Sequence, residues 1–348
     1  MGAILGVGLS DNPVIARQDE LWTYSLRQAL INDSTPESIK SPETWPAEMR
    51  VPWESDHGTA LARSVRESQE REFRRVRKAI DEFEPDAVIV IAKDHREALD
   101  RSLMVPYWFS AGDRVSMHPW RTLADTPSVF GDPADTGFEL PGAPELSYDL
   151  LEGLAGEGFD APYRFGDCVS APHALASALV HLDWDDRAFS TPTIMLGVSP
   201  FGPRDRNVVG LSPLAHAAPL PPRRAFDLGA AIARVVLRGT SRVVIAAAAG
   251  WSHANNTAAS RHWLWPDVDA DEKLYASWRE GDLRCVADLD PAQLEEHGWW
   301  EHSIWAVLAG AMTESGSELT YSSLQTNYLF NSNWVTSIFD PVDSHPTV

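Results

Sequence analysis

The chain has 348 residues, of which 44% are hydrophobic, and a formal net charge of −21 at pH 7. This size and composition are those of a globular protein with a large core. The strongly negative charge argues against nucleic acid or an anionic membrane as a partner. No linker rich in proline, glycine or serine divides the sequence, so we predict a single domain over residues 1–348.

The cysteine content and the amino-terminal sequence indicate a cytoplasmic protein. The chain has two cysteines, Cys168 and Cys285, and neither belongs to a Cys-x-x-Cys pair. A disulfide framework is therefore not expected, which is typical of a reducing compartment. The first apolar run stops at Asp11 without a preceding basic region, unlike a secretory signal. No apolar run approaches the roughly 18 residues that a membrane-spanning helix needs.

Apolar segments that suit buried strands alternate with segments of helical periodicity. In chain order, we predict a strand at 3–9, a helix at 17–31, a surface loop at 32–52, a long helix at 58–83 and a strand at 86–92. Next come an extended stretch at 103–109, a loop at 112–144, helices at 146–154 and 173–182, and a strand at 192–198. A loop at 201–222 precedes a helix at 223–237, a strand in the first half of 242–254, and helices at 271–278, 291–296 and 300–312. This alternation predicts a layered α/β fold.

Three of the predicted strands end in side chains suited to metal or proton chemistry. The first is followed by Ser10-Asp11-Asn12-Pro13, the second by Lys93-Asp94-His95, and the last by Trp251-Ser252-His253. Ligands of open α/β sheets bind outside the carboxyl ends of the strands, so we expect these residues to share one site. His253 is the strongest candidate, because a histidine after a buried strand can transfer protons near neutral pH.

These motifs and a late helix give the chain a resemblance to the class III extradiol ring-cleaving dioxygenases, the family of the protocatechuate 4,5-dioxygenase catalytic subunit. The family's first strand ends in Ser/Thr-His-x-Pro, where this chain has Ser10-Asp11-Asn12-Pro13. Its second strand ends in Asp-His or Asp-Gln, here Asp94-His95, and its central strand in Trp/Met-Ser-His, here Trp251-Ser252-His253. Its late helix carries a glutamate ahead of Gly-Ala-Met, here Glu301 and Gly310-Ala311-Met312. The resemblance covers nearly the whole chain.

The resemblance implies a three-layer α/β/α fold with a central mixed sheet and a non-haem metal site. Carried over residue by residue, the metal ligands would be Asp11, His95 and Glu301, with His253 as the acid/base catalyst and His173 as a second-rank catalytic candidate. The family's two histidines and one carboxylate hold Fe(II) with open positions for a catecholate and O2. The expected enzyme cleaves the ring of a small catechol-type aromatic with O2. A homo-oligomer, or an assembly with a second subunit, is expected.

Two departures from the family pattern leave alternatives open. Asp11 stands where the family has histidine, and the histidine that the family often has near Asp167-Cys168 is missing, although His173 remains. A second carboxylate lowers the positive charge at the metal and tilts its preference from Fe(II) toward Mn(II) or Mg(II). The alternatives are an enzyme of the same fold with a non-oxidative reaction (hydrolysis, hydration or C–C lysis), with or without a metal, and a non-catalytic subunit that has lost the metal.

The candidate residues also have structural interpretations. Asp11 precedes Asn-Pro, a sequence that suits a turn or a helix cap. Glu301 would be favoured in a first helical turn by the helix dipole. His95 has charged neighbours that are typical of a surface loop, and His173 is placed as an ordinary residue at a helix start. The positions of these side chains in the fold decide between the two kinds of interpretation.

Overall fold

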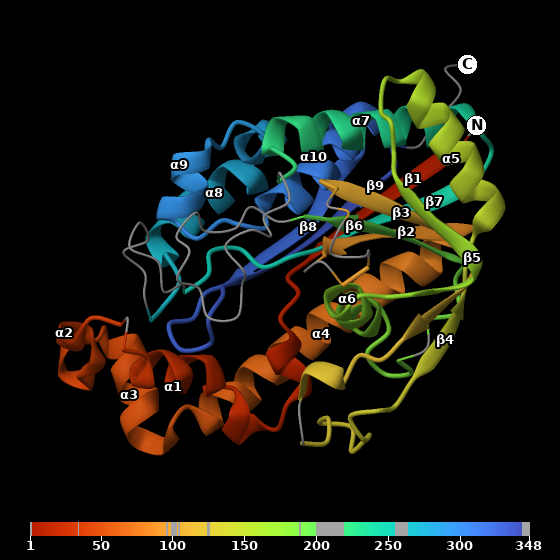
Figure 1. Cartoon of the computed structure of the whole chain (residues 1–348). Coiled ribbons are helices and arrows are strands. Elements are labelled where there is room, and N and C mark those ends of the chain that lie inside the picture. The colour runs from red at the N-terminus through yellow and green to blue at the C-terminus, as the bar shows by residue number, and fades with distance from the viewer. Residues whose placement is uncertain are drawn as a thin grey trace.

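The computed structural model describes residues 2–33, 35–94, 97–98, 103, 105–123, 126–187, 189–199, 219–254 and 264–342. A large mixed sheet with helices on both faces dominates this part of the chain (Figure 1). Its strands are β1 (Ala3–Leu9), β2 (Ala87–Lys93), β3 (Tyr107–Met117), β4 (Phe138–Pro141), β5 (Tyr163–Ser170), β6 (Thr193–Val198), β7 (Arg242–Ala248), β8 (Glu318–Gln325) and β9 (Trp334–Asp340).

The strand order is β4-β3-β6-β2-β7-β1-β9-β8, and β5 pairs with β3. The four central strands β6, β2, β7 and β1 are parallel, whereas β3 and β9 run antiparallel to their neighbours β6 and β1. The central strands are continuous apolar runs because helices cover both of their faces. As a consequence, the carboxyl ends of β2, β7 and β1 lie next to one another at one edge of the sheet.

The helices are α1 (Tyr24–Ile31), α2 (Glu37–Lys40), α3 (Ala47–Asp56), α4 (Thr59–Phe83), α5 (Pro144–Gly156), α6 (His173–Leu182), α7 (Pro222–Arg238), α8 (Val268–Arg279), α9 (Pro291–Glu296) and α10 (His302–Ser315). Side chains of α5, α7 and α10 form one apolar core with one face of the sheet, and those of α4 and α6 form a second core with the other face. On β2, Ile89 belongs to the first core, and its neighbours Val88 and Val90 belong to the second. Within the described ranges, no helix is both long and apolar enough to cross a bilayer.

The structure confirms the predicted α/β architecture with a mixed sheet between helices, and it corrects several boundaries. The described part of segment 32–52 is not all loop, because it contains α2 and the first part of α3. Their N-cap residues are Pro36 and Pro46, and a helix start tolerates proline because its first N–H groups have no partner within the helix. Segment 17–31 contains one short 3-10 helix, Asp19–Leu21, before α1. Segment 112–144 includes the end of β3 and all of β4. Most of the predicted loop at 201–222 lies outside the described residues.

Helices α7 and α10 approach each other at two glycines. A Cβ atom on Gly229 would lie 1.9 Å from the carbonyl oxygen of Val307, and one on Gly310 would lie 1.9 Å from that of Phe226. Backbone carbonyls cannot move aside as a flexible side chain can, so a larger residue would push the helices apart. This packing fixes the position of α10, whose N-cap residue is Glu301.

The substitution Gly310→Ala is expected to lower the free energy of unfolding by about 1–3 kcal/mol, because it overfills this contact. Gly156→Ala is the matched control, since Gly156 ends α5 and a Cβ atom there would meet no heavy atom within 4 Å. Alanine at such an open helical position stabilises by roughly 0.5–1 kcal/mol. The urea midpoint should therefore fall in Gly310→Ala and rise in Gly156→Ala. Equal shifts in the two variants would contradict the close approach of α7 and α10.

Candidate functional site

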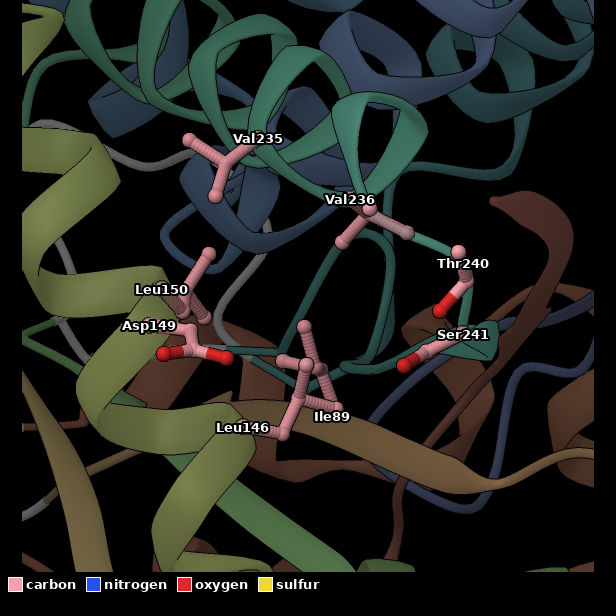
Figure 2. Close-up of a pocket in the computed structure, with 9 residues that line it drawn as sticks. Ile89, Leu146, Asp149, Leu150, Val235, Val236, Thr240 and Ser241 are labelled. Atoms are coloured by element: carbon pink, nitrogen blue, oxygen red, sulfur yellow. The ribbon is translucent and has the colours of Figure 1, made fainter. Parts of the chain in front are cut away.

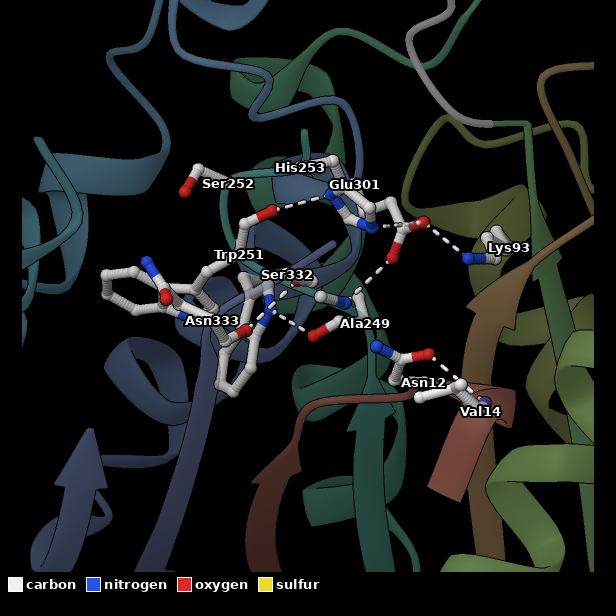
Figure 3. A network of polar contacts seen from close by, with 12 residues as sticks. Asn12, Val14, Lys93, Ala249, Trp251, Ser252, His253, Glu301, Ser332 and Asn333 are labelled. Carbon is white, nitrogen blue, oxygen red and sulfur yellow. Dashed lines mark hydrogen bonds and ion pairs between the residues drawn. The ribbon is translucent and has the colours of Figure 1, made fainter. Parts of the chain in front are cut away.

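The structure brings Asp11, Lys93, His253 and Glu301 together at the carboxyl ends of β1, β2 and β7. Figure 3 shows Lys93 and His253 on either side of Glu301. Asp11 follows β1, Lys93 is the last residue of β2, and His253 follows β7 after a short turn. The fourth member, Glu301, comes from the start of α10. The strand ends that we predicted to share one site therefore lie close together among the described residues.

Glu301 is the centre of the group. Its Oε1 accepts a hydrogen bond from Lys93 Nζ at 2.6 Å, and its Oε2 accepts one from the backbone N–H of Gly250 at 2.7 Å. Burial by itself would raise the pKa of Glu301, but the Lys93 ammonium, His253 and these hydrogen bonds outweigh it and lower the pKa to about 2. Glu301 is therefore ionised, and its side chain serves the site and does not cap its own helix.

Lys93 is the residue that the sequence interpretation missed. Burial lowers its pKa, but Glu301 and Asp11 raise it by more, so the net shift is upward and the ammonium stays protonated. Its side chain is only 11% exposed, and a lysine is seldom buried unless it is paired. The feature of the sequence that could have indicated Lys93 is its position at the end of an otherwise apolar strand, Ala87–Lys93.

Asp11 is buried, and its two carboxylate oxygens differ. Oδ1 accepts a hydrogen bond from Ser177 Oγ at 2.6 Å, whereas Oδ2 has no hydrogen-bond partner among the described residues. Burial raises the pKa of Asp11 to about 6, against the lowering effects of Lys93 and Ser177. Asp11 is not a helix cap, because Asn12 has that role and accepts from Val14 N.

His253 is held in one orientation beside Glu301. Its Nδ1 lies 2.8 Å from the carbonyl oxygen of Trp251, and its Nε2 lies 3.4 Å from Glu301 Oε1. Because a carbonyl can only accept, Nδ1 carries the proton of the neutral ring and Nε2 is left with a free lone pair. Burial lowers the pKa of His253. A Cβ atom on Gly250 would lie 2.6 Å from the ring, so the turn needs glycine there.

The other two predicted site residues have different outcomes. His173 begins α6, its Nδ1 contacts a carboxylate oxygen of Glu97, and it lies close enough to Asp11 to lower the pKa of that carboxyl. His95 lies outside the described residues. The adjacent Asp94 anchors the chain by accepting from Trp108 Nε1 at 2.8 Å and from the backbone of Glu97 at 2.9 Å.

The predicted metal centre includes His95, which lies outside the described residues, so these supply only two of its three ligands, Asp11 and Glu301. Within the described ranges, no group of three or more histidine, cysteine or acidic side chains is arranged to hold a metal ion. Both oxygens of Glu301 already accept from N–H donors, and one of these donors is the cationic Lys93. A metal bound by Glu301 would have to displace this ammonium.

Two cavities lined by described residues lie at the opposite edge of the sheet. The smaller has a volume of about 150 Å³ and lies between α5 and α7, where Leu150 and Val235 face Ile89 and Ser241 (Figure 2). The larger has a volume of about 490 Å³ and lies beside α4 and β9. Neither is lined by Asp11 or any other member of the site, so these cavities do not define its substrate pocket.

No protein-family model matches the chain, and no curated protein matches it. Among solved structures, the chain is similar to the crystal structure of the uncharacterized protein JW3007 from Escherichia coli K12, at 15% sequence identity and a TM-score of 0.39. The alignment covers 95% of this chain and 98% of that chain. A likeness at this TM-score carries no argument about function, so the function is argued from the site itself.

Proposed function

We propose that this chain is an enzyme that transfers protons in a non-oxidative reaction, with Lys93, Glu301 and His253 as its catalytic group. The observation that carries the proposal is the contact of 2.6 Å between Lys93 Nζ and Glu301 Oε1. The same oxygen, Glu301 Oε1, lies 3.4 Å from His253 Nε2. In the dioxygenases that the sequence resembles, a metal supplies the positive charge of the site. In this chain, we propose that the ammonium of Lys93 supplies it. A buried ion pair is seldom the most stabilising choice for a core, so a catalytic role is a reason for keeping it.

His253 is the proposed base. Its Nε2 takes a proton from a hydroxyl group of the substrate, and the imidazolium that forms is stabilised by the carboxylate of Glu301. Lys93 stabilises the negative charge that is left on the substrate oxygen. In C–C lysis, the C–C bond next to this oxygen breaks as the oxygen forms a carbonyl, and His253 returns the proton to the carbon that receives the electron pair. In hydration or hydrolysis, His253 takes the proton from water instead, and the water oxygen forms the new bond. The reaction needs no electron acceptor.

Asp11 supports a hydroxylated substrate. Its Oδ2 is buried without a hydrogen-bond partner among the described residues, and a buried acceptor of this kind costs stability until a donor reaches it. A substrate hydroxyl supplies that donor. We therefore propose a small hydroxylated aromatic compound as the substrate, and hydration, hydrolysis or C–C lysis as the class of reaction.

A metal-dependent extradiol dioxygenase is the second candidate. The observation that favours it is also Asp11 Oδ2, which is buried and close enough to Glu301 to feel its charge. In this case Asp11, His95 and Glu301 would hold Fe(II) or Mn(II), and Lys93 would have to leave Glu301. The contact between Lys93 and Glu301 is the reason for ranking this candidate second.

The two candidates are separated by an assay with and without oxygen. Protein treated with EDTA is incubated with a panel of catechols and other hydroxylated aromatics, in anaerobic and in air-saturated buffer. We expect turnover without oxygen, at a rate that EDTA treatment does not change. Turnover that requires both oxygen and added Fe(II) would reject the proposal in favour of the dioxygenase. Absence of turnover together with co-purification of a second protein would instead support a non-catalytic subunit.

A further inference from the structure

The turn that carries His253 is attached to a buried carboxylate of α8, Asp271. Ser252 donates to Asp271 Oδ2 through its backbone N–H at 3.1 Å and through its hydroxyl at 2.6 Å. Trp299 Nε1 donates to Oδ1 at 2.6 Å, and Asn333 Nδ2 donates to Oδ2 at 2.8 Å. One fully buried side chain thus joins three segments: the turn after β7, the residues before α10 and the start of β9.

The same segments also contact the turn through their backbones. His253 N donates to the carbonyl of Gly298 at 3.1 Å, one residue before Trp299. Ala254 N donates to the carbonyl of Asn331 at 2.8 Å, and His253 and Ser332 form an isolated β-bridge. Figure 3 shows Ser332 and Asn333 beneath the turn that bears His253. The bonds to Asp271 therefore end on the segments that fix the backbone of His253.

This arrangement is costly for the fold. The donors to Asp271 described above are neutral side chains and a backbone N–H, so no cation among them compensates the buried charge. Burial raises the pKa of Asp271 to about 6 even though these bonds lower it. An asparagine would not serve as well, because its amide nitrogen cannot accept from donors on both sides. A carboxylate is the side chain that can accept all of these bonds.

We propose that Asp271 is a positioning residue that fixes the turn Trp251-Ser252-His253, so that His253 Nδ1 donates to Trp251 O and Nε2 is directed toward Glu301. The effect of Asp271 on catalysis rests on the proposed function. The orientation and the tautomer of His253, however, are properties of the folded chain alone. They can be measured whether or not a substrate is known.

The test loosens the network without removing the buried carboxylate. Trp299→Phe deletes the indole donor to Oδ1, and Ser252→Ala deletes the hydroxyl donor to Oδ2. Trp278→Phe is the matched control, because Trp278 is also fully buried and its Nε1 donates at 2.9 Å to Ser337 Oγ, which is not part of the network. All three variants keep an apolar or small side chain in place, and their folding is checked by thermal unfolding.

The readout is the 15N spectrum of histidine-labelled protein, with the His253 signals assigned from His253→Gln. We expect a single Nδ1–H tautomer in the natural chain and in Trp278→Phe, and a mixture of tautomers or a broadened signal in Trp299→Phe and Ser252→Ala. Unchanged His253 signals in both of these folded variants would overturn the proposal. On a compound turned over in the anaerobic assay, kcat should fall by about 100-fold with KM unchanged, because a misplaced base transfers the proton more slowly. Failure of the assay would reject the proposed function and leave the spectroscopic result intact.

Discussion

Lys93→Met is expected to lower the free energy of unfolding at pH 7.5 by about 3–5 kcal/mol, because it leaves the carboxylate of Glu301 buried without its cation. Lys93 Nζ is 2.6 Å from Glu301 Oε1, and both side chains are almost inaccessible to solvent. Methionine has a similar length and packs in the same space. The loss of free energy of unfolding therefore comes mainly from the missing positive charge and only to a small extent from changed packing. Urea unfolding monitored by tryptophan fluorescence measures the effect.

The double variant Lys93→Met with Glu301→Gln is the control. Removing both charges removes the penalty of the unpaired carboxylate, so most of the lost stability should return. Activity on a compound turned over in the anaerobic assay should not return, because the stabilising cation is still missing. A Lys93→Met variant within about 1 kcal/mol of the natural chain, the range of an exposed pair, would contradict the buried ion pair.

Asp11→Asn is expected to stabilise the protein at neutral pH and to have little effect near pH 4. Burial raises the pKa of Asp11 from 3.8 to about 6. The folded chain therefore binds more protons than the unfolded chain between these values, and its stability falls as the pH rises from about 4 to about 6. A shift of this size corresponds to about 3 kcal/mol at pH 7.5. Asparagine carries no charge and avoids this cost.

The measurement is the urea midpoint of both proteins at several pH values from 4 to 8. Glu43→Gln, a change at an exposed acidic residue, is the control and should follow the natural chain at every pH. The difference in urea midpoint between Asp11→Asn and the natural chain should increase from pH 4 to pH 6 and then stay constant. A constant difference over the whole range, or a loss of stability at pH 7.5, would show that Asp11 is satisfied in the fold. A stabilised variant that has lost turnover would indicate that Asp11 is kept for function.

The buried part of the fold could be predicted from the sequence because its patterns are strong. The continuous apolar runs of β1 and β7 indicate strands covered on both faces, and the apolar stripe of α4 indicates an amphipathic helix. The strand β8 was missed, because its residues are polar and half-exposed and its extended form is stabilised by pairing with β9. Such pairing depends on tertiary structure and leaves no local signal.

The members of the candidate site that could be predicted are mainly those that come directly after a predicted strand. Asp11, His253 and Glu301 do lie in one group, as their positions after strands and before an apolar helix indicated. Lys93 belongs to the same motif but was overlooked, because a lysine at a strand end is usually solvated. Asp271 could not be predicted, since it lies on a different helix and meets the turn of His253 only in the folded chain.

The most direct test of the central claim is a crystal structure of the purified protein with anomalous diffraction data collected at the iron and manganese edges. We predict that the ammonium of Lys93 lies within hydrogen-bonding distance of Glu301, with His253 Nε2 beside it and no anomalous peak at the site. A peak bound by Asp11, His95 and Glu301, with Lys93 turned away, would contradict the claim and establish the metal-dependent alternative.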